Sequence, residues 1–542
     1  MIRFENVSFS YDKAQQATLS DVELVIPEGE LCVVIGRSGS GKSTLLKCVN
    51  GLAPRFTGGE LRGRVLTDGF DTSTRDTKEF AGLVGYVGQD PSASFVAETV
   101  EQELVYGMEQ LCIEPNIMRP RVEAVIDLLG LDRLRARRLT ELSGGEQQRV
   151  AIGAVLTSHP RILVLDEPTS ALDPGAAEDV LAVLSRLVED FGLTVLLAEH
   201  RLERVLQFSD RVIVVGRGGQ VTAAEPAQAM EFAPLAPPVV ELGRAAGWRP
   251  LPTTVRAARR LARQDPRLVD FEPEPMGPAV AAEPAPVVVR TSKLTMKYRD
   301  VVALREVDLA VRDQSVTTLM GRNGSGKSTL MWTLQGARRP TSGRVDVDGS
   351  DPAGMSAARA RRRIALVPQN PSDLLYLPTV ADECRQADRE SQRPPGTCES
   401  LLVGVLPGVD AGQHPLDLSE GQRLALALAV QLTGSPKVLL LDEPTRGLDY
   451  PAKHRLAELL RSIVADPDAP TTCVMIATHD VEFAAAVSDS IVVLSDGEII
   501  SQGDPGTILT QSPLFTPQLA RVLEGRALTL ADLAAPLDGA AR

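Results

Sequence analysis

The sequence predicts an α/β protein built from two tandem copies of one domain, each with an α/β core and a helical subdomain. The first observation is internal repetition, because GRSGSGKST at residues 36–44 returns as GRNGSGKST at residues 321–329. A second segment also occurs twice, as LVLDEPTSALD at residues 163–173 and LLLDEPTRGLD at residues 439–449. The repeat distances are 285 positions between the lysines and 276 between the DEP aspartates. Near-equal distances with the motifs in the same order indicate a tandem duplication.

Short apolar runs identify the strands of each core. Leu31–Ile35, Ile162–Leu165 and Val195–Ala198 are continuous apolar runs, as expected of strands that are buried on both faces. Burial on both faces requires a mostly parallel sheet with helical crossovers. Residues 96–142 contain helical patterns such as ETVEQELVYGMEQL. We therefore expect a helical insertion between the glycine-rich loop and the DEP strand.

A different composition separates the two copies. Residues 222–288 hold 12 of the 38 prolines, and alanine is also frequent there. This composition is typical of an extended linker, and its arginine-rich piece at 256–263 fits a short amphipathic helix with a solvated charged face. The predicted division is a first domain at 1–221, a linker at 222–288, and a second domain with a C-terminal tail at 289–542.

Composition and charge exclude several classes of protein. The 542 residues carry 57 Lys and Arg against 71 Asp and Glu, a formal net charge of −14. This balance argues against a protein that coats nucleic acid or anionic lipid, although a local pocket can still bind a small anion. No apolar run approaches the roughly 18 residues of a membrane span, and the N-terminus lacks the apolar region of a signal peptide. The six cysteines include no CxxC pair, so we expect reduced, buried thiols and no zinc site.

The pattern GxxxxGKS, placed after a strand and before a helix, predicts a phosphate-binding loop in each copy. Its glycines let the backbone curve closely around an anion, with the N–H groups pointing inward. Lys42 and Lys327 are expected to reach the β- and γ-phosphates of a nucleotide, and Ser43 and Ser328 to bind Mg²⁺. Because the loop occurs twice in full, a simple glycine-rich turn does not explain it.

Each copy has an Asp-Glu pair directly after four apolar residues. This position is the carboxyl end of a buried strand, which is the edge where open α/β sheets bind ligands. We expect Asp166 and Asp442 to hold Mg²⁺. Glu167 and Glu443 are placed to polarise the attacking water as general bases.

A Ser-Gly-Gly turn that opens a helix, LSGGEQQR at residues 142–149, precedes the first Asp-Glu pair. A hydroxyl and free N–H groups at a helix N-terminus suit a phosphate. Ser143 precedes Asp166 by 23 positions, and Ser419 precedes Asp442 by the same 23.

With these motifs in this order, each copy resembles an ATP-binding-cassette (ABC) ATPase, a member of the P-loop nucleotide hydrolases. The resemblance covers nearly the whole chain outside the linker and implies ATP and Mg²⁺ as ligands. It implies a phosphate loop formed by Gly36, Gly39, Gly41, Lys42, Ser43, Thr44, Gly321, Gly324, Gly326, Lys327, Ser328 and Thr329. The Mg²⁺ ligands it implies are Ser43, Gln89, Asp166, Ser328, Gln369 and Asp442.

The same resemblance implies four further pairs of site residues. Gln89 and Gln369 match the glutamine that senses Mg²⁺ and the transmembrane partner, and with Glu167, Glu443, His200 and His479 they complete the catalytic set. His200 and His479 match the switch histidine near the γ-phosphate. Asp173 and Asp449 match the D-loop aspartate, and Tyr11 and Tyr298 match the aromatic residue that stacks on adenine.

In the family that the chain resembles, each ATP lies between the phosphate loop of one domain and the Ser-Gly-Gly signature of the other. The Lys327 site would then use Ser143, Gly144 and Gly145, and the Lys42 site would use Ser419, Glu420 and Gly421. Glu420 stands where the family has glycine. A carboxylate near the γ-phosphate adds like-charge repulsion and a side chain where the backbone must approach closely. We expect both sites to bind ATP and the Lys42 site to turn over more slowly.

Among fused ABC proteins, the chain most resembles the ATPases of energy-coupling-factor (ECF) importers for thiamine or its hydroxymethylpyrimidine precursor. The segments that carry this resemblance are NGLAPRFTGGELRGRV at 50–65, GQDPSASFVAETVEQELVYGMEQL after residue 87, LSGGEQQRVAIGA at 142–154, AEHRLERVLQFSDRV at 198–212 and DEPTRGLDYPAK at 442–453. It implies a peripheral subunit on the cytoplasmic face of the membrane. The implied partners are a transmembrane coupling protein and a separate substrate-binding membrane protein, so this chain would not contact the transported substrate.

Two other functions stay open. A fused ATPase of a sugar or peptide importer has the same chemistry, but such ATPases usually lose catalytic residues in one copy, and both copies are complete here. A soluble ABC-type translation factor acting on ribosomes needs a long charged helical linker. The 12 prolines and the near balance of 7 basic and 8 acidic residues in 222–288 argue against one long helix and against RNA binding.

Overall fold

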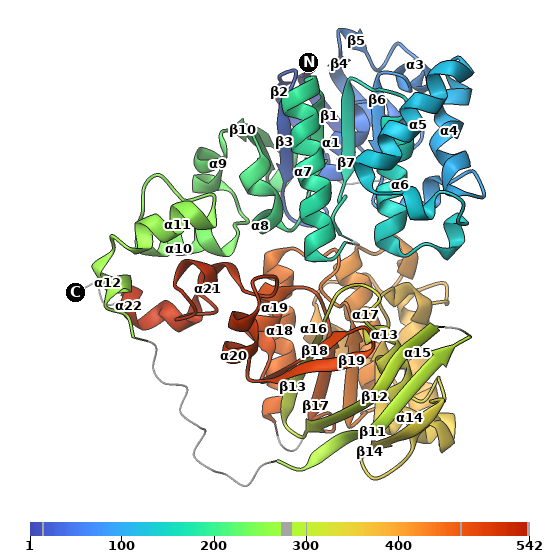
Figure 1. The fold of residues 1–542 in the computed structure, drawn as a ribbon, viewed down its shortest axis with the longest axis vertical. Coiled ribbons are helices and arrows are strands. Elements are labelled where there is room, and N and C mark those ends of the chain that lie inside the picture. Colours follow the sequence, from blue (N-terminus) through green and yellow to red (C-terminus); the bar gives the residue numbers. More distant parts are fainter. Residues whose placement is uncertain (13–15, 171, 273–284, 300, 467–468, 539–542) are drawn as a thin grey trace. The chain divides into compact units, whose positions relative to one another are not determined.

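The computed structural model describes residues 1–12, 16–170, 172–272, 285–299, 301–466 and 469–538 (Figure 1). The chain forms two compact units, unit 1 at Met1–Leu261 and unit 2 at Ala262–Arg542. Within the described ranges, no helix has both the length and the apolar character needed to cross a membrane.

Unit 1 contains a six-stranded sheet with the strand order β10-β9-β3-β8-β7-β6. Its strands are β3 (Leu31–Ile35), β6 (Val84–Val87), β7 (Ile162–Asp166), β8 (Thr194–Ala198), β9 (Arg211–Val215) and β10 (Val221–Ala224). Neighbouring strands run parallel, except that β10 pairs antiparallel with β9 at one edge. Every residue of β3, β7 and β8 is buried, because helices and a second sheet cover both faces. The predicted parallel α/β core is confirmed.

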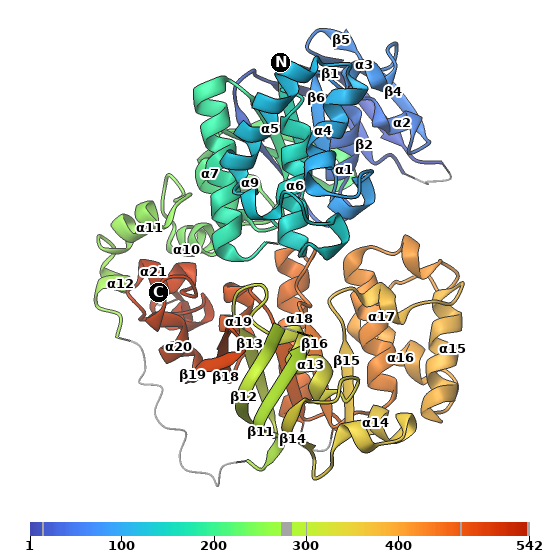
Figure 2. The same ribbon diagram turned by 45° about the vertical axis from the view of Figure 1, so that its right-hand side comes forward.

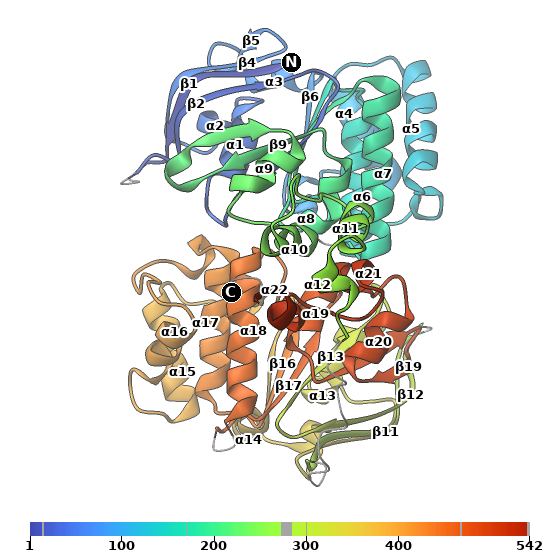
Figure 3. The same cartoon turned by 90° about the vertical axis from the view of Figure 1, so that its left-hand side faces the viewer.

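The second sheet of unit 1 is antiparallel, with the order β2-β1-β4-β5 (Figure 3). Its strands are β1 (Ile2–Ser10), β2 (Leu19–Ile26), β4 (Glu60–Thr67) and β5 (Phe70–Asp71). Helix α1 (Lys42–Cys48) contributes Leu45, Leu46 and Cys48 to a core that also contains side chains from both sheets. The helix that follows the phosphate loop is therefore held firmly by apolar packing.

Unit 2 repeats this plan. Its six-stranded sheet has the order β15-β16-β17-β13-β18-β19, and its antiparallel sheet has the order β12-β11-β14. The strands are β11 (Val287–Tyr298), β12 (Val301–Arg312), β13 (Ser315–Met320), β14 (Ser342–Val347), β15 (Ile364–Val367), β16 (Val438–Asp442), β17 (Cys473–Ala477), β18 (Ser490–Ser495) and β19 (Glu498–Gly503). Helix α13 (Lys327–Leu334) packs between the sheets through Leu330, Met331 and Leu334.

Each unit carries a cluster of three helices in the region where the sequence predicts a helical subdomain (Figure 2). In unit 1 these are α4 (Val100–Gln110), α5 (Pro115–Leu129) and α6 (Gly144–Leu156). In unit 2 they are α15 (Val380–Ser391), α16 (Thr397–Val405) and α17 (Glu420–Thr433). The first helix of each cluster follows the predicted Q-loop glutamine, and the last begins at the signature serine. The helical subdomain is confirmed in both copies.

The remaining helices lie between the strands or near the ends of the units. In unit 1 they are α2 (Leu52–Arg55), α3 (Thr77–Phe80), α7 (Pro174–Phe191), α8 (Leu202–Val205), α9 (Pro226–Phe232), α10 (Pro238–Ala246) and α11 (Val255–Ala262). In unit 2 they are α12 (Pro266–Val269), α14 (Ala357–Arg363), α18 (Tyr450–Ala465), α19 (Val481–Val487), α20 (Pro505–Gln511), α21 (Gln518–Val522) and α22 (Ala534–Asp538).

The segment expected to be an extended linker, 222–288, differs from that expectation over much of its length. Helices α9 to α12 occupy most of residues 226–269, and side chains such as Met230, Val240 and Leu242 are fully buried. Pro226, Pro238 and Pro266 begin three of these helices instead of preventing them, because proline at the first helical position loses no hydrogen bond. The arginine-rich piece forms α11, as predicted. Residues 273–284 of this segment lie outside the described residues.

Candidate active sites

The two phosphate loops have the same geometry. In unit 1 the loop joins β3 to α1, and Lys42 Nζ donates to the carbonyl oxygens of Gly36 at 3.0 Å and Arg37 at 3.1 Å. In unit 2 Lys327 Nζ donates to Gly321 O at 2.8 Å and Arg322 O at 3.2 Å. Each ammonium group therefore lies inside the curve of its own loop, where a bound phosphate can replace the carbonyl contacts.

Glycine is required at several loop positions. Gly41 and Gly326 precede the helices with φ of 105°, a conformation that side chains rarely adopt. A Cβ on Gly321 would lie 2.3 Å from the Leu494 carbonyl oxygen, and one on Gly36 would lie 2.6 Å from the Val215 carbonyl oxygen. A Cβ on Gly39 or Gly324 would meet nothing within 4 Å, because these glycines face the open side of the loop. The loop thus packs tightly on the sheet and stays open toward the side where a ligand approaches.

A serine and an aspartate meet beside each loop. Ser43 donates to Asp166, and Ser328 donates to Asp442. Burial raises the pKa of Asp166, and it raises the pKa of Asp442 to about 6. Oδ1 of Asp442 is buried without a hydrogen-bond partner. The sequence placed these two residue types near each other from motif order alone, and the structure brings them into contact.

The glutamate, histidine and glutamine of unit 1 come together at the end of β7. Glu167 is buried, and its φ of 52° is the left-handed conformation that few residues other than glycine adopt. Oε1 of Glu167 lies 3.0 Å from His200 Nε2, and Gln89 Nε2 donates to Glu167 Oε2 at 3.3 Å. Two residues from separate parts of the chain, His200 and Gln89, therefore contact the carboxylate of Glu167.

Unit 2 reproduces only part of this cluster. His479 Nδ1 lies 2.8 Å from Glu443 Oε2, and Glu443 has φ of 50°. The Thr478 hydroxyl donates to the same carboxylate oxygen at 3.3 Å. Gln369 is exposed, and within the described part of unit 2 it has no counterpart of the bond between Gln89 and Glu167. The two copies therefore support the same Glu–His pair in different ways.

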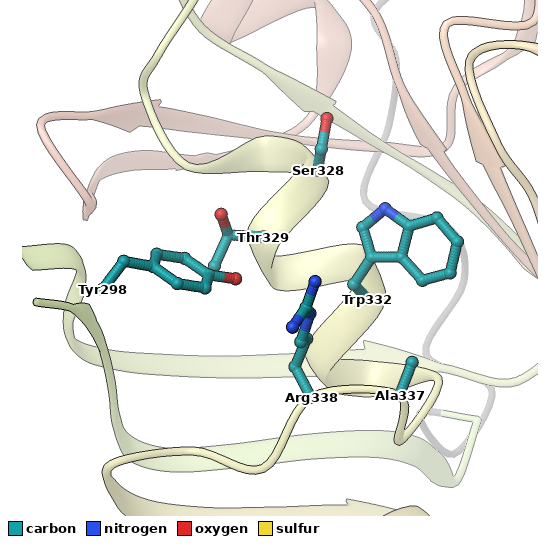
Figure 4. Close-up of a pocket in the computed structure, with 6 residues that line it drawn as sticks. All are labelled: Tyr298, Ser328, Thr329, Trp332, Ala337 and Arg338. Carbon is teal, nitrogen blue, oxygen red and sulfur yellow. The ribbon is translucent and has the colours of Figure 1, made fainter. Parts of the chain in front are cut away.

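The two tyrosines expected near the nucleotide base also differ. The Tyr11 hydroxyl is 2.8 Å from Thr44 Oγ1, and its ring packs edge-on against Phe9. Tyr298 is exposed and lines an open pocket of about 340 Å³ together with Ser328, Thr329, Trp332, Ala337 and Arg338. Figure 4 shows Arg338 between Tyr298 and Trp332. Both tyrosines thus lie beside the helix that follows the phosphate loop.

The comparisons with known proteins agree with this geometry. The profile of the ABC transporter family matches residues 19–170 and 304–446. A protein of Streptomyces avermitilis, provisionally named an ABC transporter ATP-binding protein, is 52% identical over 96% of this chain and 97% of its own length. The chain belongs to the ABC transporter family. Its ABC ATPase domains bind ATP and hydrolyse it, Mg²⁺ is generally required in the family, and members work with transmembrane partners to which they are usually attached.

One further relative and one solved structure are also similar to this ABC ATPase. A Bacillus subtilis protein provisionally named an HMP/thiamine import ATP-binding protein is 30% identical over 94% of this chain and 93% of its own length. A structure titled as a model of ribosome-bound archaeal Pelota and ABCE1 has a TM-score of 0.63 at 20% identity, covering 95% of this chain and 80% of that one. The second likeness shows the shared fold alone.

The residues of the ABC ATPase fit ATP and Mg²⁺. Three buried polar atoms beside the phosphate loops have no hydrogen-bond partner in the protein: Asp442 Oδ1 and the hydroxyls of Ser40 and Ser325. Mg²⁺ takes oxygen ligands, and phosphate oxygens accept hydroxyl bonds, so both groups would satisfy these atoms. Serine and aspartate oxygens beside a lysine-bearing loop are the donor set that such a ligand requires.

The signature serines and D-loop aspartates of the ABC ATPase cap helices. Ser143 forms a capping box with Glu146 at the start of α6, which places Gly144 and Gly145 in its first turn. Ser419 does the same with Gln422 at α17. Asp173 accepts from Ala176 N at 3.0 Å, and Asp449 accepts from Ala452 N at 2.9 Å, at the starts of α7 and α18. Capping orients these residues within their own units.

The substituted signature residue Glu420 has a contact that sequence reasoning missed. A Cβ built on Gly447 would lie 1.2 Å from Glu420 Oε2, so the carboxylate occupies space that only glycine leaves free. In the first copy the same two positions carry Gly144 and Ala171, which reverses the sizes. The sequence contained a signal for this contact: where the second copy has the larger Glu420, its other residue of the pair is the smaller Gly447. Gly421 follows Glu420 in the first turn of α17.

Sequence reasoning also missed Trp332 and Arg338. Trp332 lies four positions after Ser328 on α13, so helical periodicity puts both on one face. Arg338 N donates to Trp332 O at 3.3 Å, which folds the turn after the helix back toward the pocket. The corresponding positions of the first copy carry Lys47 and Ala53, so this pocket distinguishes the two nucleotide sites.

Proposed function

We propose that this ABC ATPase energises an ECF-type importer for a vitamin or vitamin precursor, such as thiamine or hydroxymethylpyrimidine. Support comes from the 30% identity, across almost the full length of both chains, to the Bacillus subtilis protein whose name refers to HMP/thiamine import. The functional division that goes with this proposal is a first ATP-binding domain at 1–221, a connector at 222–288 and a second ATP-binding domain at 289–542.

The observation that carries the transport proposal is a matched pair of exposed apolar residues. Val96 and Tyr376 each lie seven positions after the predicted Q-loop glutamine, and their exposed fractions are 62% and 71%. Buried Glu103 accepts from Val96 N at 3.0 Å and Ala97 N at 2.8 Å. Buried Glu383 accepts from Tyr376 N at 2.5 Å and Leu377 N at 2.6 Å.

This anchoring explains how an apolar side chain can stay exposed. The glutamate bonds satisfy the backbone and hold the segment still, so the side chain points outward at little entropic cost on binding. An exposed apolar residue on a rigid segment is typical of a protein contact. We assign Val96 and Tyr376 to contacts with a transmembrane coupling protein, which would seat one helix against each Q-loop segment.

The catalytic roles in this proposal are supported by the contacts within each unit. Lys42 and Lys327 bind the β- and γ-phosphates, while Thr44 and Thr329 lie beside Tyr11 and Tyr298 at the base side. Glu167 and Glu443 accept a proton from the attacking water, and the adjacent His200 and His479 hold those carboxylates in place. Bound Mg²⁺ supplies charge neutralisation of the phosphates, held by the Ser–Asp pairs with Gln89 and Gln369.

The remaining parts of the proposal concern location and substrate. The chain acts as a peripheral subunit at the cytoplasmic face of the membrane, and it binds no nucleic acid. A separate membrane protein selects the transported compound, so this chain has no contact with it. A fused sugar or peptide importer ATPase is the nearest alternative, because it would use the same two sites with a different membrane partner.

Co-purification from detergent-solubilised membranes tests the proposal. The tagged chain is expected to bring down two integral membrane proteins, the smaller of which binds thiamine or hydroxymethylpyrimidine. Val96→Asp and Tyr376→Asp should each reduce recovery of the larger one, whereas Phe191→Asp, at an equally exposed position at the end of α7, should not. A sugar- or peptide-binding partner would overturn the vitamin assignment. Recovery with ribosomes in place of membrane proteins would overturn the transport proposal.

A further inference from the structure

A buried carboxylate next to the switch histidine of unit 1 has no place in the catalytic set above. Glu199 directly precedes His200 and is only 2% exposed. Burial raises the pKa of this carboxyl group, while the bonds from Thr169 lower it. A carboxylate at such a position is costly unless several donors satisfy it.

Three donors satisfy it, and they belong to the two loops that carry the catalytic pair. Oε1 of Glu199 accepts from Thr169 N at 2.9 Å and from the Thr169 hydroxyl at 2.5 Å. Oε2 accepts from His200 N at 3.1 Å. Thr169 lies two residues after Glu167, so one carboxylate joins the loop of the general base to the loop of the histidine.

A nearby arginine strengthens the same connection. Arg204 Nη1 donates to the carbonyl oxygens of Thr169 and Leu172, both at 3.4 Å. Its positive charge also offsets the negative charge of Glu199. Thr169 is therefore held through its N–H by Glu199 and through its carbonyl by Arg204, which also holds the carbonyl of Leu172.

Among the described residues of unit 2, no carboxylate bridges the two loops in this way. Thr478 occupies the position of Glu199, and Phe483 occupies the position of Arg204. Thr445, the counterpart of Thr169, is 1% exposed, and its hydroxyl is buried without a hydrogen-bond partner. A buried hydroxyl without a partner is uncommon, and here the missing partner is the carboxylate that unit 1 supplies.

We propose that Glu199 is a positioning residue for ATP hydrolysis in unit 1, where it holds His200 and the loop of Glu167 at their 3.0 Å contact. This inference rests on the catalytic roles proposed for Glu167 and His200. Glu199 acts through its bonds to Thr169 and His200, and it is assigned no contact with the nucleotide. Unit 2 forms its Glu–His contact through the other ring nitrogen, His479 Nδ1, and Thr478 donates directly to Glu443, so the two sites hold the pair through different residues.

The experiment uses one substitution at two equivalent positions. Thr169→Val removes a hydroxyl that bonds to Glu199, whereas Thr445→Val removes a hydroxyl that has no partner. Steady-state ATPase of the full-length chain is measured together with ATP affinity and the melting midpoint. Displacement of a catalytic group by about 1 Å costs up to about a hundredfold in rate. Total kcat should therefore fall for Thr169→Val by nearly the whole share that unit 1 contributes, which is at most about half if unit 2 keeps its rate, and Thr445→Val should leave it unchanged.

Glu199→Gln provides the second arm. Its amide oxygen can still accept both bonds from Thr169, but its NH₂ group then faces the N–H of His200, donor against donor. We expect kcat to fall with KM and ATP affinity unchanged. The double variant with Thr169→Val should keep at least the kcat of the less active single variant, because both substitutions break the same connection.

The outcomes separate this inference from the proposed function. Glu167→Gln serves as the reference: if it leaves turnover intact, the catalytic assignment fails and the positioning role fails with it. If Glu167→Gln abolishes turnover but Thr169→Val and Thr445→Val behave alike, only the positioning role is overturned. A loss of kcat that merely follows a lowered melting midpoint or a raised KM would also overturn it, because that result indicates general damage to the fold.

Discussion

The ion pair between Lys453 and Asp480 offers a sharp test of how unit 2 is held together. Lys453 Nζ lies 2.7 Å from Asp480 Oδ2, and the two side chains are 10% and 2% exposed. Asp480 follows His479 and caps α19 by accepting from Phe483 N at 3.1 Å. Lys453 lies in the first turns of α18, just after Asp449. The pair therefore ties the switch loop to the helix that begins at the D-loop.

We predict that Lys453→Met destabilises unit 2 by about 3 kcal/mol, because it leaves a buried carboxylate without its cation. At 2.7 Å and an effective dielectric constant of about 20, the attraction is roughly 6 kcal/mol. Desolvation of the two charges offsets much of that attraction. The capping bond from Phe483 N still serves Asp480, so the loss belongs at the low end of the usual range of about 3–5 kcal/mol. For a unit of this size the melting midpoint should fall by about 6–12 °C.

Tryptophan fluorescence makes the measurement specific to one unit. The chain has two tryptophans, Trp248 in unit 1 and Trp332 in unit 2. In a Trp248→Phe background, the emission of Trp332 reports the unfolding of unit 2 alone. Arg385→Met is the matched control, because it removes the basic residue of an exposed ion pair with Asp382, where solvent screens the charges. Its midpoint should stay nearly unchanged.

A double variant provides the refutation. Lys453→Met with Asp480→Asn removes both charges while the asparagine keeps the helix cap, so it should be more stable than Lys453→Met alone. If the double variant loses as much as the two single variants added together, the charges do not interact as described. A drop no larger than that of Arg385→Met would equally refute the reasoning.

Three further predictions follow from the same structure. Gly447→Ala should lower the stability of unit 2, because it displaces the Glu420 carboxylate and puts alanine at φ of +67°. Adding Glu420→Gly should recover part of the lost stability in thermal unfolding. No recovery would contradict the contact between Gly447 and Glu420. In metal-free protein, Asp442→Asn should raise the melting midpoint at pH 8 but not at pH 4. The pKa of Asp442 is raised from 3.8 to about 6, so the protonated carboxyl group contributes its full stability below pH 3.8. That contribution is lost as the pH rises through about 6, where the buried group becomes charged. A similar gain at both pH values would speak against that shift. In the Trp248→Phe background, ATP with Mg²⁺ should quench Trp332, and Arg338→Ala should raise the ATP concentration needed for half of the effect, as a fluorescence titration will show; an unchanged titration would remove Arg338 from the nucleotide pocket.

Much of the fold was predictable because its signals are local. Continuous apolar runs such as Leu31–Ile35 form strands buried on both faces, and the glycines before Lys42 and Lys327 adopt backbone conformations that few other residues reach. Because each motif occurs twice in the same order, each prediction was supported by two copies of the motif. Contact of Ser43 with Asp166, and of Ser328 with Asp442, also follows from topology, since parallel strands bring their carboxyl ends to one edge of the sheet.

The folded part of 222–288 shows where local signals mislead. Twelve prolines suggest an extended chain, but whether a proline interrupts a helix or begins one depends on its position in that helix. Pro226, Pro238 and Pro266 stand at helix starts, and apolar residues between them find a surface to cover in the folded protein. Composition alone contains no information about that surface.

The sequence by itself determined the chemistry of this protein: two phosphate loops, two Asp-Glu pairs and a family of nucleotide hydrolases. Only the tertiary structure decided how each site is supported, with Glu199 joining two loops in unit 1 and the hydroxyl of Thr445 left without a partner in unit 2. The physical reason is the separation along the chain over which each kind of information acts. A motif encodes backbone conformation and functional groups within a few residues, whereas Thr169 and Glu199 are 30 positions apart and meet only because β7 and β8 are neighbours in the folded sheet.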